Sequence, residues 1–343
     1  MNVGLSYWGF CEKFEDSKEA KTPDGHRYGR PIFVDAMREA GHNVIALQRQ
    51  RELKQYPGLI YPADDFPDID VLFIEWRWPT YKNSGPDKFE PDLDRQTELL
   101  DHYHGKIPIV IWDCDYKVTA EDELRWPLAI IADPAFTPRE LTRRRERLMF
   151  WTDWKPLFKM NPSALEYGYI GNNYERPQAF NMYYSRPALA LRANGVQTTV
   201  HGNWLEISPE REHPSELIRH HPNIAFAHRL NFYESMKRLN SFLCTTHITK
   251  PEYAQRGFAS PRYLENIVCN VLALVPVEFS RREILGPRWI AYGTDGTLSR
   301  IRDIRNMSVQ QRDEALQEQA FNLKSLDVFS VSYVVKYLES LKK

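Results

Sequence analysis

The stretch Ser260-Pro-Arg-Tyr-Leu-Glu265, followed by the apolar run Ile267-Val-Cys-Asn-Val-Leu-Ala-Leu-Val-Pro276, indicates a helix that leads into a buried strand. Arg262 and Glu265 are three residues apart and therefore share one face of that helix. Arginine suits a diphosphate through its planar fork of donors, and a carboxylate suits the paired hydroxyls of a ribose. The same spacing occurs in intrahelical ion pairs on solvated faces. Ligands of open α/β sheets bind where such helices and strands meet, which favours a nucleotide diphosphate here.

The composition is that of a soluble globular protein. The chain has 343 residues, of which 42% are hydrophobic and 27% charged, with a formal net charge of −1. This length predicts two domains of about 150 residues each, and the charge gives no overall attraction to nucleic acid. The four cysteines lack the paired spacing of zinc or redox sites. The N-terminus lacks signal-peptide features and no apolar run approaches a membrane span, so we expect a cytoplasmic protein.

The first half of the chain alternates apolar strands with helical segments. The predicted strands are Val3–Ser6, Asn43–Leu47, Asp70–Glu75, Ile107–Trp112 and Leu128–Ala132. Helices are predicted over 31–40, where Gly41 ends the pattern, and over 92–103. Continuous apolar strands separated by helices are typical of a parallel sheet covered on both faces.

The second half repeats this alternation. Strands are predicted at Tyr167–Gly171, Gln197–His201 and Ser241–Thr245, with helices at Arg186–Ala193 and Phe232–Asn240. From Val309 onward the chain reads as a polar helix followed by an amphipathic one. We therefore expect an α/β fold of two Rossmann-like domains that face a central cleft, with a C-terminal helix crossing back to the first. The predicted ranges are 1–160, 161–310 and a helical tail over 311–343.

Glycines and polar side chains follow the strands of the second predicted domain. Gly171 ends a strand, where the backbone can approach a ligand and free N–H groups can meet phosphate, although a simple turn has the same sequence. Arg176 is a second candidate cation for a diphosphate, and a solvated arginine is an equal alternative. Further candidates at strand ends are Asn172, Asn173, His201, Asn203 and Arg256. Their convergence at one edge favours a binding site.

Two aspartates end the fourth predicted strand of the first domain. Asp113 follows Trp112 directly and is the preferred general base, with Asp115 second, because a carboxylate there can take a proton from an attacking hydroxyl. Capping of a helix or turn is the alternative role for either aspartate. Glu75, at the end of the third strand, is a candidate for holding an acceptor, as are His26 and Arg27 before the first helix.

Two histidine pairs are spaced closely enough to be considered as metal ligands. His220 and His221 are adjacent, and His102 and His104 are separated by one residue. Neither pair has a third ligand at a sensible spacing, so we interpret them as surface histidines and predict no metal site.

Together these residues carry a family resemblance. Two Rossmann-like units, the loop Gly171-Asn-Asn-Tyr-Glu-Arg176, the strand end His201-Gly-Asn203 and the helix Arg262-Tyr-Leu-Glu265 resemble a glycosyltransferase of the GT-B fold. Order and length resemble the bacteriophage DNA β-glucosyltransferases, which modify 5-hydroxymethylated pyrimidines. The Arg–Leu–Glu helix is also similar to that of spore-associated glycosyltransferases, which act on other acceptors.

The resemblance implies roles for individual residues. Arg262 and Glu265 match the arginine and glutamate that hold the donor diphosphate and ribose, and Asp113 matches the family's aspartate base. The family's glycine-rich phosphate loop carries two arginines, whereas only Arg176 stands near here, and Gly171-Asn-Asn replaces the paired glycines. The resemblance implies a UDP-sugar as co-substrate, with UDP-glucose as the first choice. The sequence itself does not require a divalent metal.

A basic stretch near the predicted domain boundary bears on the acceptor. Arg143, Arg144 and Arg145 are followed by Trp151 and Trp154, and arginines neutralise phosphates while aromatic wedges help to extrude a base. Interleaved glutamates make a solvated helix face the alternative. The resemblance favours double-stranded DNA with hydroxymethylated bases as the partner of a monomeric enzyme.

These observations predict an inverting, UDP-sugar-dependent glycosyltransferase. Arg262, Arg176 and the Gly171 loop would stabilise the departing UDP without an obligatory metal. The alternatives are a glycosyltransferase for a small molecule or surface polymer, and a nucleotide-binding module that has lost turnover.

Overall fold

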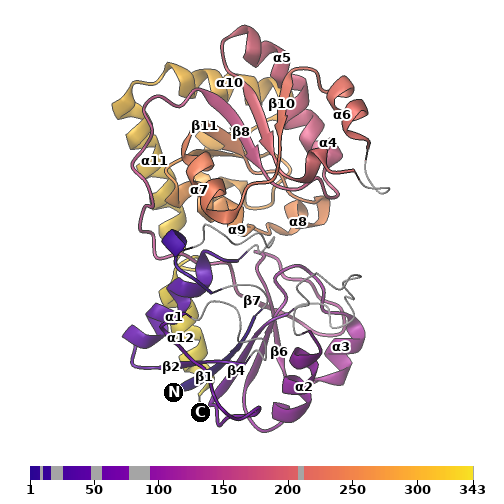
Figure 1. The fold of residues 1–343 in the computed structure, drawn as a ribbon, viewed down its shortest axis with the longest axis vertical. Helices are drawn as coiled ribbons and strands as arrows, with labels where there is room; N and C mark the ends of the chain where they lie inside the picture. The colour runs from indigo at the N-terminus through magenta and orange to yellow at the C-terminus, as the bar shows by residue number, and fades with distance from the viewer. Residues whose placement is uncertain (8–10, 17–25, 48–55, 77–92, 208–211, 343) are drawn as a thin grey trace. The chain divides into compact units, whose positions relative to one another are not determined.

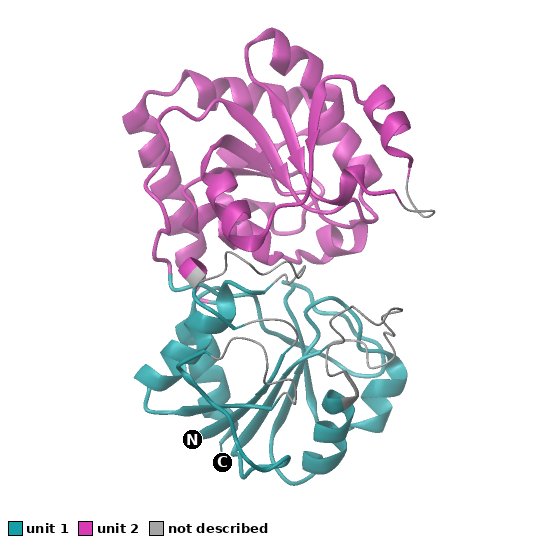
Figure 2. Ribbon diagram, viewed as in Figure 1, with its two compact units in different colours: residues 1–13, 22–153, 328–343 teal, residues 14–21, 154–327 magenta. Residues whose placement is uncertain are grey.

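The computed structural model describes residues 1–7, 11–16, 26–47, 56–76, 93–207 and 212–342 (Figure 1). The chain divides into two compact units, coloured separately in Figure 2. Unit 1 comprises 1–13, 22–153 and 328–343, and unit 2 comprises 14–21 and 154–327.

Unit 1 is built on a parallel sheet. Within the described residues its seven strands run in the order β3-β2-β1-β4-β5-β6-β7. Their bounds are β1 Asn2–Ser6, β2 Asn43–Ala46, β3 Leu59–Ile60, β4 Val71–Glu75, β5 Ile109–Trp112, β6 Ile130–Asp133 and β7 Glu146–Arg147. The strand order reverses between β1 and β4, so the crevice at their carboxyl ends is the point where such sheets bind ligands.

Helices cover both faces of this sheet. They are α1 Gly29–Glu39, α2 Leu93–Tyr103, α3 Ala120–Arg125 and, from the far end of the chain, α12 Val331–Leu341. One core joins strand residues such as Leu72 and Ile111 to Leu99 and Leu100 of α2, all fully buried. Thr119 begins α3 with a capping box, because its side chain accepts from the amide of Asp122 while that carboxylate accepts from Thr119.

Unit 2 is built on a second parallel sheet, whose described strands run in the order β10-β9-β8-β11-β12-β13. Their bounds are β8 Glu166–Ile170, β9 Thr198–His201, β10 Ile224–Ala227, β11 Phe242–Thr246, β12 Leu272–Pro276 and β13 Ile290–Ala291. The order reverses between β8 and β11. This second switch point places the loops after those two strands side by side.

The helices of unit 2 pack in two groups. Their bounds are α4 Pro177–Phe180, α5 Arg186–Ala193, α6 Pro214–His220, α7 Phe232–Asn240, α8 Pro251–Arg256, α9 Pro261–Val268, α10 Gly293–Asn306 and α11 Val309–Lys324. A π-helical turn, Asn181–Ser185, joins α4 to α5. Helix α9 contacts both α7 and α11, whereas α5 contacts α10. Helix α9 begins as the sequence predicts, with Pro261 in its first turn, and its apolar residues are buried.

The predicted C-terminal tail is divided between the units. Helix α11 belongs to unit 2, and residues from Val328 onward belong to unit 1, where α12 contacts α1. The chain passes from unit 1 to unit 2 after Asp153, and residues 14–21 also belong to unit 2. The ranges 1–160, 161–310 and 311–343 therefore differ from the observed units, chiefly because polar α11 packs on β12 through a minority of buried residues.

No helix in the described ranges is long and apolar enough to cross a membrane.

Candidate functional site

The carboxyl edge of the unit 2 sheet gathers most of the predicted donor residues. The loop after β8 begins at Gly171, whose amide donates to the carbonyl of His201 at 3.0 Å. The indole of Trp204 donates to the Gly171 carbonyl at 2.7 Å. Gly202 has a φ of +152°, and a Cβ there would lie 2.2 Å from the Gly171 carbonyl oxygen. The loops after β8 and β9 therefore touch through backbone, which only glycine permits.

Asn203 holds the β8 loop by a hydrogen bond to its backbone. Its side chain is fully buried, and its Oδ1 accepts from the amide of Asn173 at 2.8 Å. Asn172 lies in the same loop and is partly exposed. Asn203 thus fixes the conformation of the loop that the sequence assigned to phosphate, while the loop itself stays accessible.

Arg176 lies at the end of this loop, as N-cap residue of α4. Its Nε donates to the carbonyl of Tyr174 at 2.9 Å and its Nη1 to the hydroxyl of Tyr169 at 2.7 Å. These contacts hold the guanidinium at the edge of the sheet. A planar guanidinium has five donors, so donors remain for an anion.

His247 follows β11 on the other side of the switch point. Burial, assisted by the charge of Arg176, lowers the pKa of this imidazole to about 3, so His247 is neutral at physiological pH. Its ring centroid lies 4.8 Å from that of Tyr263 on α9. His247 thus packs against the helix that carries Arg262.

Arg262 and Glu265 meet as the sequence spacing predicts. Arg262 Nη1 lies 2.5 Å from Glu265 Oε2, and the side chains are 33% and 4% exposed. The pair lies on α9, which begins beyond the carboxyl end of β11. The guanidinium is therefore accessible, and the carboxylate is held at the boundary of the core.

His201 and Arg256 make other contacts. His201 Nε2 accepts from Arg238 Nε at 3.0 Å, and Arg238 also pairs with Glu166, so this imidazole is committed to a structural ion-pair group. Arg256 pairs with Glu252 on α8 at 3.4 Å. The prediction that His201 binds the donor finds no geometric support, because both of its ring nitrogens have protein partners.

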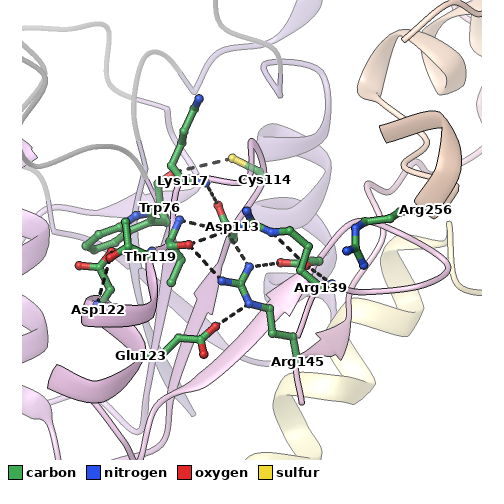
Figure 3. A network of polar contacts seen from close by, with 12 residues as sticks. Trp76, Asp113, Cys114, Lys117, Thr119, Asp122, Glu123, Arg139, Arg145 and Arg256 are labelled. Carbon is green, nitrogen blue, oxygen red and sulfur yellow. Dashed lines mark hydrogen bonds and ion pairs between the residues drawn. The ribbon is translucent and has the colours of Figure 1, made fainter. Parts of the chain in front are cut away.

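In unit 1, Asp113 lies at the carboxyl end of β5 inside a network of ion pairs (Figure 3). The side chain is 0% exposed. Its Oδ1 accepts from the amide of Lys117 at 2.5 Å, and its Oδ2 accepts from Val118, Arg139 and Arg145. Burial raises the pKa of Asp113, and the two arginines and two amides offset part of that increase. Asp115, two residues on, is partly exposed.

His26 and Glu75 do come together, at the switch point between β1 and β4. His26 Nδ1 lies 3.0 Å from Glu75 Oε1, and Arg30 donates to both carboxylate oxygens of Glu75. Burial alone would raise the pKa of Glu75, but Arg30 and His26 outweigh it and lower that pKa to about 2. Arg27 pairs with Glu12 instead. All of these side chains are buried, so the predicted acceptor contacts are internal ion pairs in this structure.

The basic stretch proves to be partly core. Arg145 is 3% exposed and pairs with three carboxylates, so it is not a phosphate contact. Arg143 donates to the carbonyls of Trp126 and Pro127, whereas Arg144 is exposed. Trp151 is also core, 1% exposed, with its indole donating to the Gly29 carbonyl. The sequence did not reveal this, because runs of arginine are usually solvated.

The histidine pairs have ordinary contacts. His102 stacks on Phe66, and His220 pairs with Glu212. Across the described residues, no group of three or more His, Cys, Asp or Glu side chains is arranged to hold a metal ion.

Comparison with known proteins identifies the architecture. No family model and no curated protein matches the chain. Among solved structures, T4 phage β-glucosyltransferase in complex with its UDP-glucose substrate matches over 100% of both chains, with a TM-score of 0.63 and 14% identity. The chain has the GT-B fold. An α-glucosyltransferase in complex with UDP and a 13-mer DNA containing a hydroxymethyluracil base matches over 99% of both chains, with a TM-score of 0.58 and 13% identity.

The same architecture occurs in an enzyme with a different role. A glycosyltransferase involved in avilamycin A biosynthesis covers 99% of this chain and 96% of its own, with a TM-score of 0.56 and 12% identity. The predicted fold class and the resemblance to phage β-glucosyltransferases are thus confirmed at the level of fold.

Sequence reasoning missed several residues of the two candidate regions. They are Glu123, Asp133 and Arg139 around Asp113, Arg30 beside Glu75, and His247 beside Arg176. Asp133 directly follows the predicted strand Leu128–Ala132, and His247 lies two residues beyond the predicted strand Ser241–Thr245, so their positions were a usable signal. The arginines and Glu123 carried none, because the carboxylate or guanidinium that each pairs with at 2.6–3.0 Å lies 22 or more residues away in sequence.

Proposed function

We propose that this chain is an inverting glycosyltransferase that moves a sugar from a UDP-sugar to 5-hydroxymethylated pyrimidines in DNA. Glucose is the first candidate for that sugar. The UDP-sugar site is assigned from the Arg262–Glu265 pair on α9. This pair lies at the carboxyl edge of a sheet whose strand order reverses between β8 and β11. Arg262 would bind the diphosphate and Glu265 the ribose. The full-length likeness to a UDP-glucose complex supports this assignment.

The departing UDP would be stabilised by groups already fixed in place. Arg176 and the β8 loop lie on one side of the switch point and Arg262 on the other, so positive charge flanks the crevice. Preorganised donors of this kind stabilise a leaving group without reorganisation during the reaction. The transfer forms a bond from the acceptor oxygen to the anomeric carbon and breaks the bond to the β-phosphate, whose electron pair leaves with UDP.

The proton of the acceptor hydroxyl would pass to the Asp113–Asp115 loop. Asp113 stays first because its raised pKa makes it a stronger base, and because Oδ1 accepts only one hydrogen bond from the described residues. Its complete burial means that the loop must open when the acceptor binds. Asp115 is second because it is already partly exposed.

A glycosyltransferase for a small molecule or surface polymer is the second candidate. Two observations favour it: Arg145 is buried rather than available to DNA, and the chain is also similar in fold to a glycosyltransferase of avilamycin biosynthesis. Support for the DNA acceptor comes from the fold likeness to a DNA-modifying β-glucosyltransferase and to an α-glucosyltransferase in complex with DNA that contains a hydroxymethyluracil base.

The donor assignment is tested by calorimetry with UDP. Arg262→Ala should weaken binding by about 1.5–3 kcal/mol, the range for hydrogen bonds to charged groups. Glu265→Ala should weaken UDP more than pyrophosphate, which lacks the ribose. Arg288→Ala, which removes an exposed arginine of unit 2, is the matched control and should bind like the wild type. Unchanged UDP affinity in both site variants would refute the assignment.

The acceptor is tested by mass spectrometry of reaction products. Duplexes with 5-hydroxymethylcytosine, 5-hydroxymethyluracil or unmodified bases are incubated with a panel of UDP-sugars, and only the hydroxymethylated duplexes should gain one sugar per modified base. Transfer to small alcohols but not to DNA would establish the second candidate. UDP binding without any transfer or hydrolysis would instead identify a nucleotide-binding module.

A further inference from the structure

The ion-pair network around Asp113 links the carboxyl ends of β5 and β6 to α3 and to Arg139 and Arg145 (Figure 3). Arg145 is its centre: Nη1 lies 2.9 Å from Asp113 Oδ2 and 2.9 Å from Asp133 Oδ1, and Nε lies 2.8 Å from Glu123 Oε1. One guanidinium therefore joins the ends of β5 and β6 to α3. Its remaining Nη2 donates to the carbonyl of Val118 at 3.1 Å, so all three guanidinium nitrogens of Arg145 have partners within the protein.

Arg139 supplies the second half of the network. Its Nη2 lies 2.6 Å from Asp113 Oδ2, and its backbone amide donates to Asp133 Oδ2 at 2.7 Å. Asp133 is thus held at both oxygens, one by each arginine residue. Any change in the charge of Asp133 alters the same two residues that bind Asp113.

The donors are distributed unequally over the Asp113 carboxylate. Three of them, Val118, Arg139 and Arg145, reach Oδ2, and one, the Lys117 amide, reaches Oδ1. A carboxylate has about four lone-pair sites on two oxygens, so Oδ2 is saturated and Oδ1 retains acceptor capacity. The network therefore selects one oxygen and fixes the plane of the carboxylate.

We propose that Asp133 and Arg145 are positioning residues for sugar transfer, which hold Asp113 so that its Oδ1 receives the acceptor proton. Asp133 competes with Asp113 for Arg145, and so limits how strongly Arg145 stabilises the Asp113 carboxylate. This inference rests on the proposed function. It adds two residues that do not touch substrate and act through Asp113.

The charge balance agrees with this arrangement. Among the described residues, three carboxylates, Asp113, Glu123 and Asp133, pair with two guanidiniums, Arg139 and Arg145. The charge of Arg143 also interacts with Glu123 and Arg145. Burial, opposed by Arg145 and assisted by the charge of Asp113, raises the pKa of Asp133 to about 6. Below that pH, Asp133 would be protonated and would no longer compete for the positive charge of Arg145. Arg145 would then stabilise the Asp113 carboxylate more strongly, which makes Asp113 a weaker base.

Asp133→Asn tests the proposal because it keeps the shape of the side chain and removes the competing charge. We expect kcat to fall by at least about tenfold, the acid limb of the kcat profile to move to lower pH, and KM for the UDP-sugar to stay unchanged. Asp101→Asn, which alters an exposed pair with Arg125 in the same unit, is the matched control and should change none of these. An unaltered kcat and pH profile in Asp133→Asn, with transfer active in the wild type, would overturn the proposal.

A second variant and a readout that does not depend on turnover test the same proposal independently. Arg145→Lys keeps the positive charge but lacks the planar guanidinium that contacts three carboxylates and the Val118 carbonyl at once, so it should lower kcat without changing UDP binding. The pKa of Asp113, followed by NMR of aspartate labelled at the side-chain carboxyl carbon, should fall in Asp133→Asn relative to the wild type. That readout needs no turnover, so failure of the proposed function and failure of this inference are distinguishable.

Discussion

Glu75 is one of the buried charges that organise unit 1. Its carboxylate is 1% exposed and is held by Arg30 at both oxygens and by His26. Such a pair is costly to desolvate but more costly to break, because removal of one member leaves the other charge buried without compensation.

Replacing Glu75 therefore has a predictable cost. Glu75→Gln should lower the free energy of unfolding by about 3–5 kcal/mol at pH 7, measured by urea denaturation. Glu98→Gln, which removes the charge of a 39%-exposed carboxylate paired with Arg95, is the control and should change the free energy of unfolding by less than about 1 kcal/mol. Equal effects of the two substitutions would contradict the structural role of Glu75.

The pH dependence of that difference follows from the lowered pKa. A carboxyl whose folded-state pKa is about 2 contributes stability above its unfolded pKa of 4.5 and loses it as pH falls toward 2. The gap between wild type and Glu75→Gln should consequently be constant from pH 7 to about 5 and narrow below that.

At the scale of elements, the donor crevice depends on how two loops meet. The loop after β9 passes against the loop after β8 at Gly202, where a Cβ would lie 2.2 Å from a backbone oxygen. Asn203 and Trp204, the next two residues, then accept from or donate to the β8 loop. The conformation of the proposed phosphate loop thus depends on a glycine of the neighbouring loop.

Gly202→Ala should consequently impair both stability and donor binding. We expect a loss of about 2–3 kcal/mol of unfolding free energy in unit 2, from backbone strain and displacement of the β8 loop, together with weaker UDP binding. Gly41→Ala is the matched control, since Gly41 also has a positive φ but a Cβ there would meet nothing within 4 Å; it should cost only about 1 kcal/mol. Normal UDP affinity in Gly202→Ala would show that the loop contact is dispensable.

At the scale of the whole molecule, the last two helices serve different units. Leu323 of α11 and Leu338 of α12 are both fully buried, the first in unit 2 and the second in unit 1. Helix α12 is attached to unit 1 by Val334 and Leu338, by pairing of Thr152 with Ser330, and by His42 with Glu339. The C-terminal residues thus complete the unit in which the chain begins.

Substitution of each leucine by alanine should destabilise only the unit to which its helix belongs. Leu338→Ala should reduce amide protection in β5 of unit 1, and Leu323→Ala should reduce it in β12 of unit 2, by about 2–5 kcal/mol of local stability in each case. Hydrogen exchange with mass spectrometry measures both in one experiment, with Phe321→Ala, at an exposed position of α11, as control. If Leu338→Ala destabilised only unit 2, the division into units would be wrong.

The sequence by itself determined the regular elements and the fold class. Continuous apolar runs produced β4, β5, β8, β11 and β12 nearly within their predicted bounds, and the helices Arg186–Ala193 and Phe232–Asn240 match α5 and α7. It also placed Asp113 at the end of β5 and brought Arg262 to Glu265, because strand ends and helix spacing are local properties.

Only the tertiary structure decided which charges are internal. Arg145 stands in a run of arginines that reads as solvated, yet it pairs with Asp113, Glu123 and Asp133, which are 12 to 32 residues away in sequence. The same holds for Glu75, whose partners precede it by more than 40 residues. The physical reason is that a charge can be buried only where residues of other elements pair with it. A sequence pattern shows the spacing of residues along the chain, but it does not show which distant residues will pair.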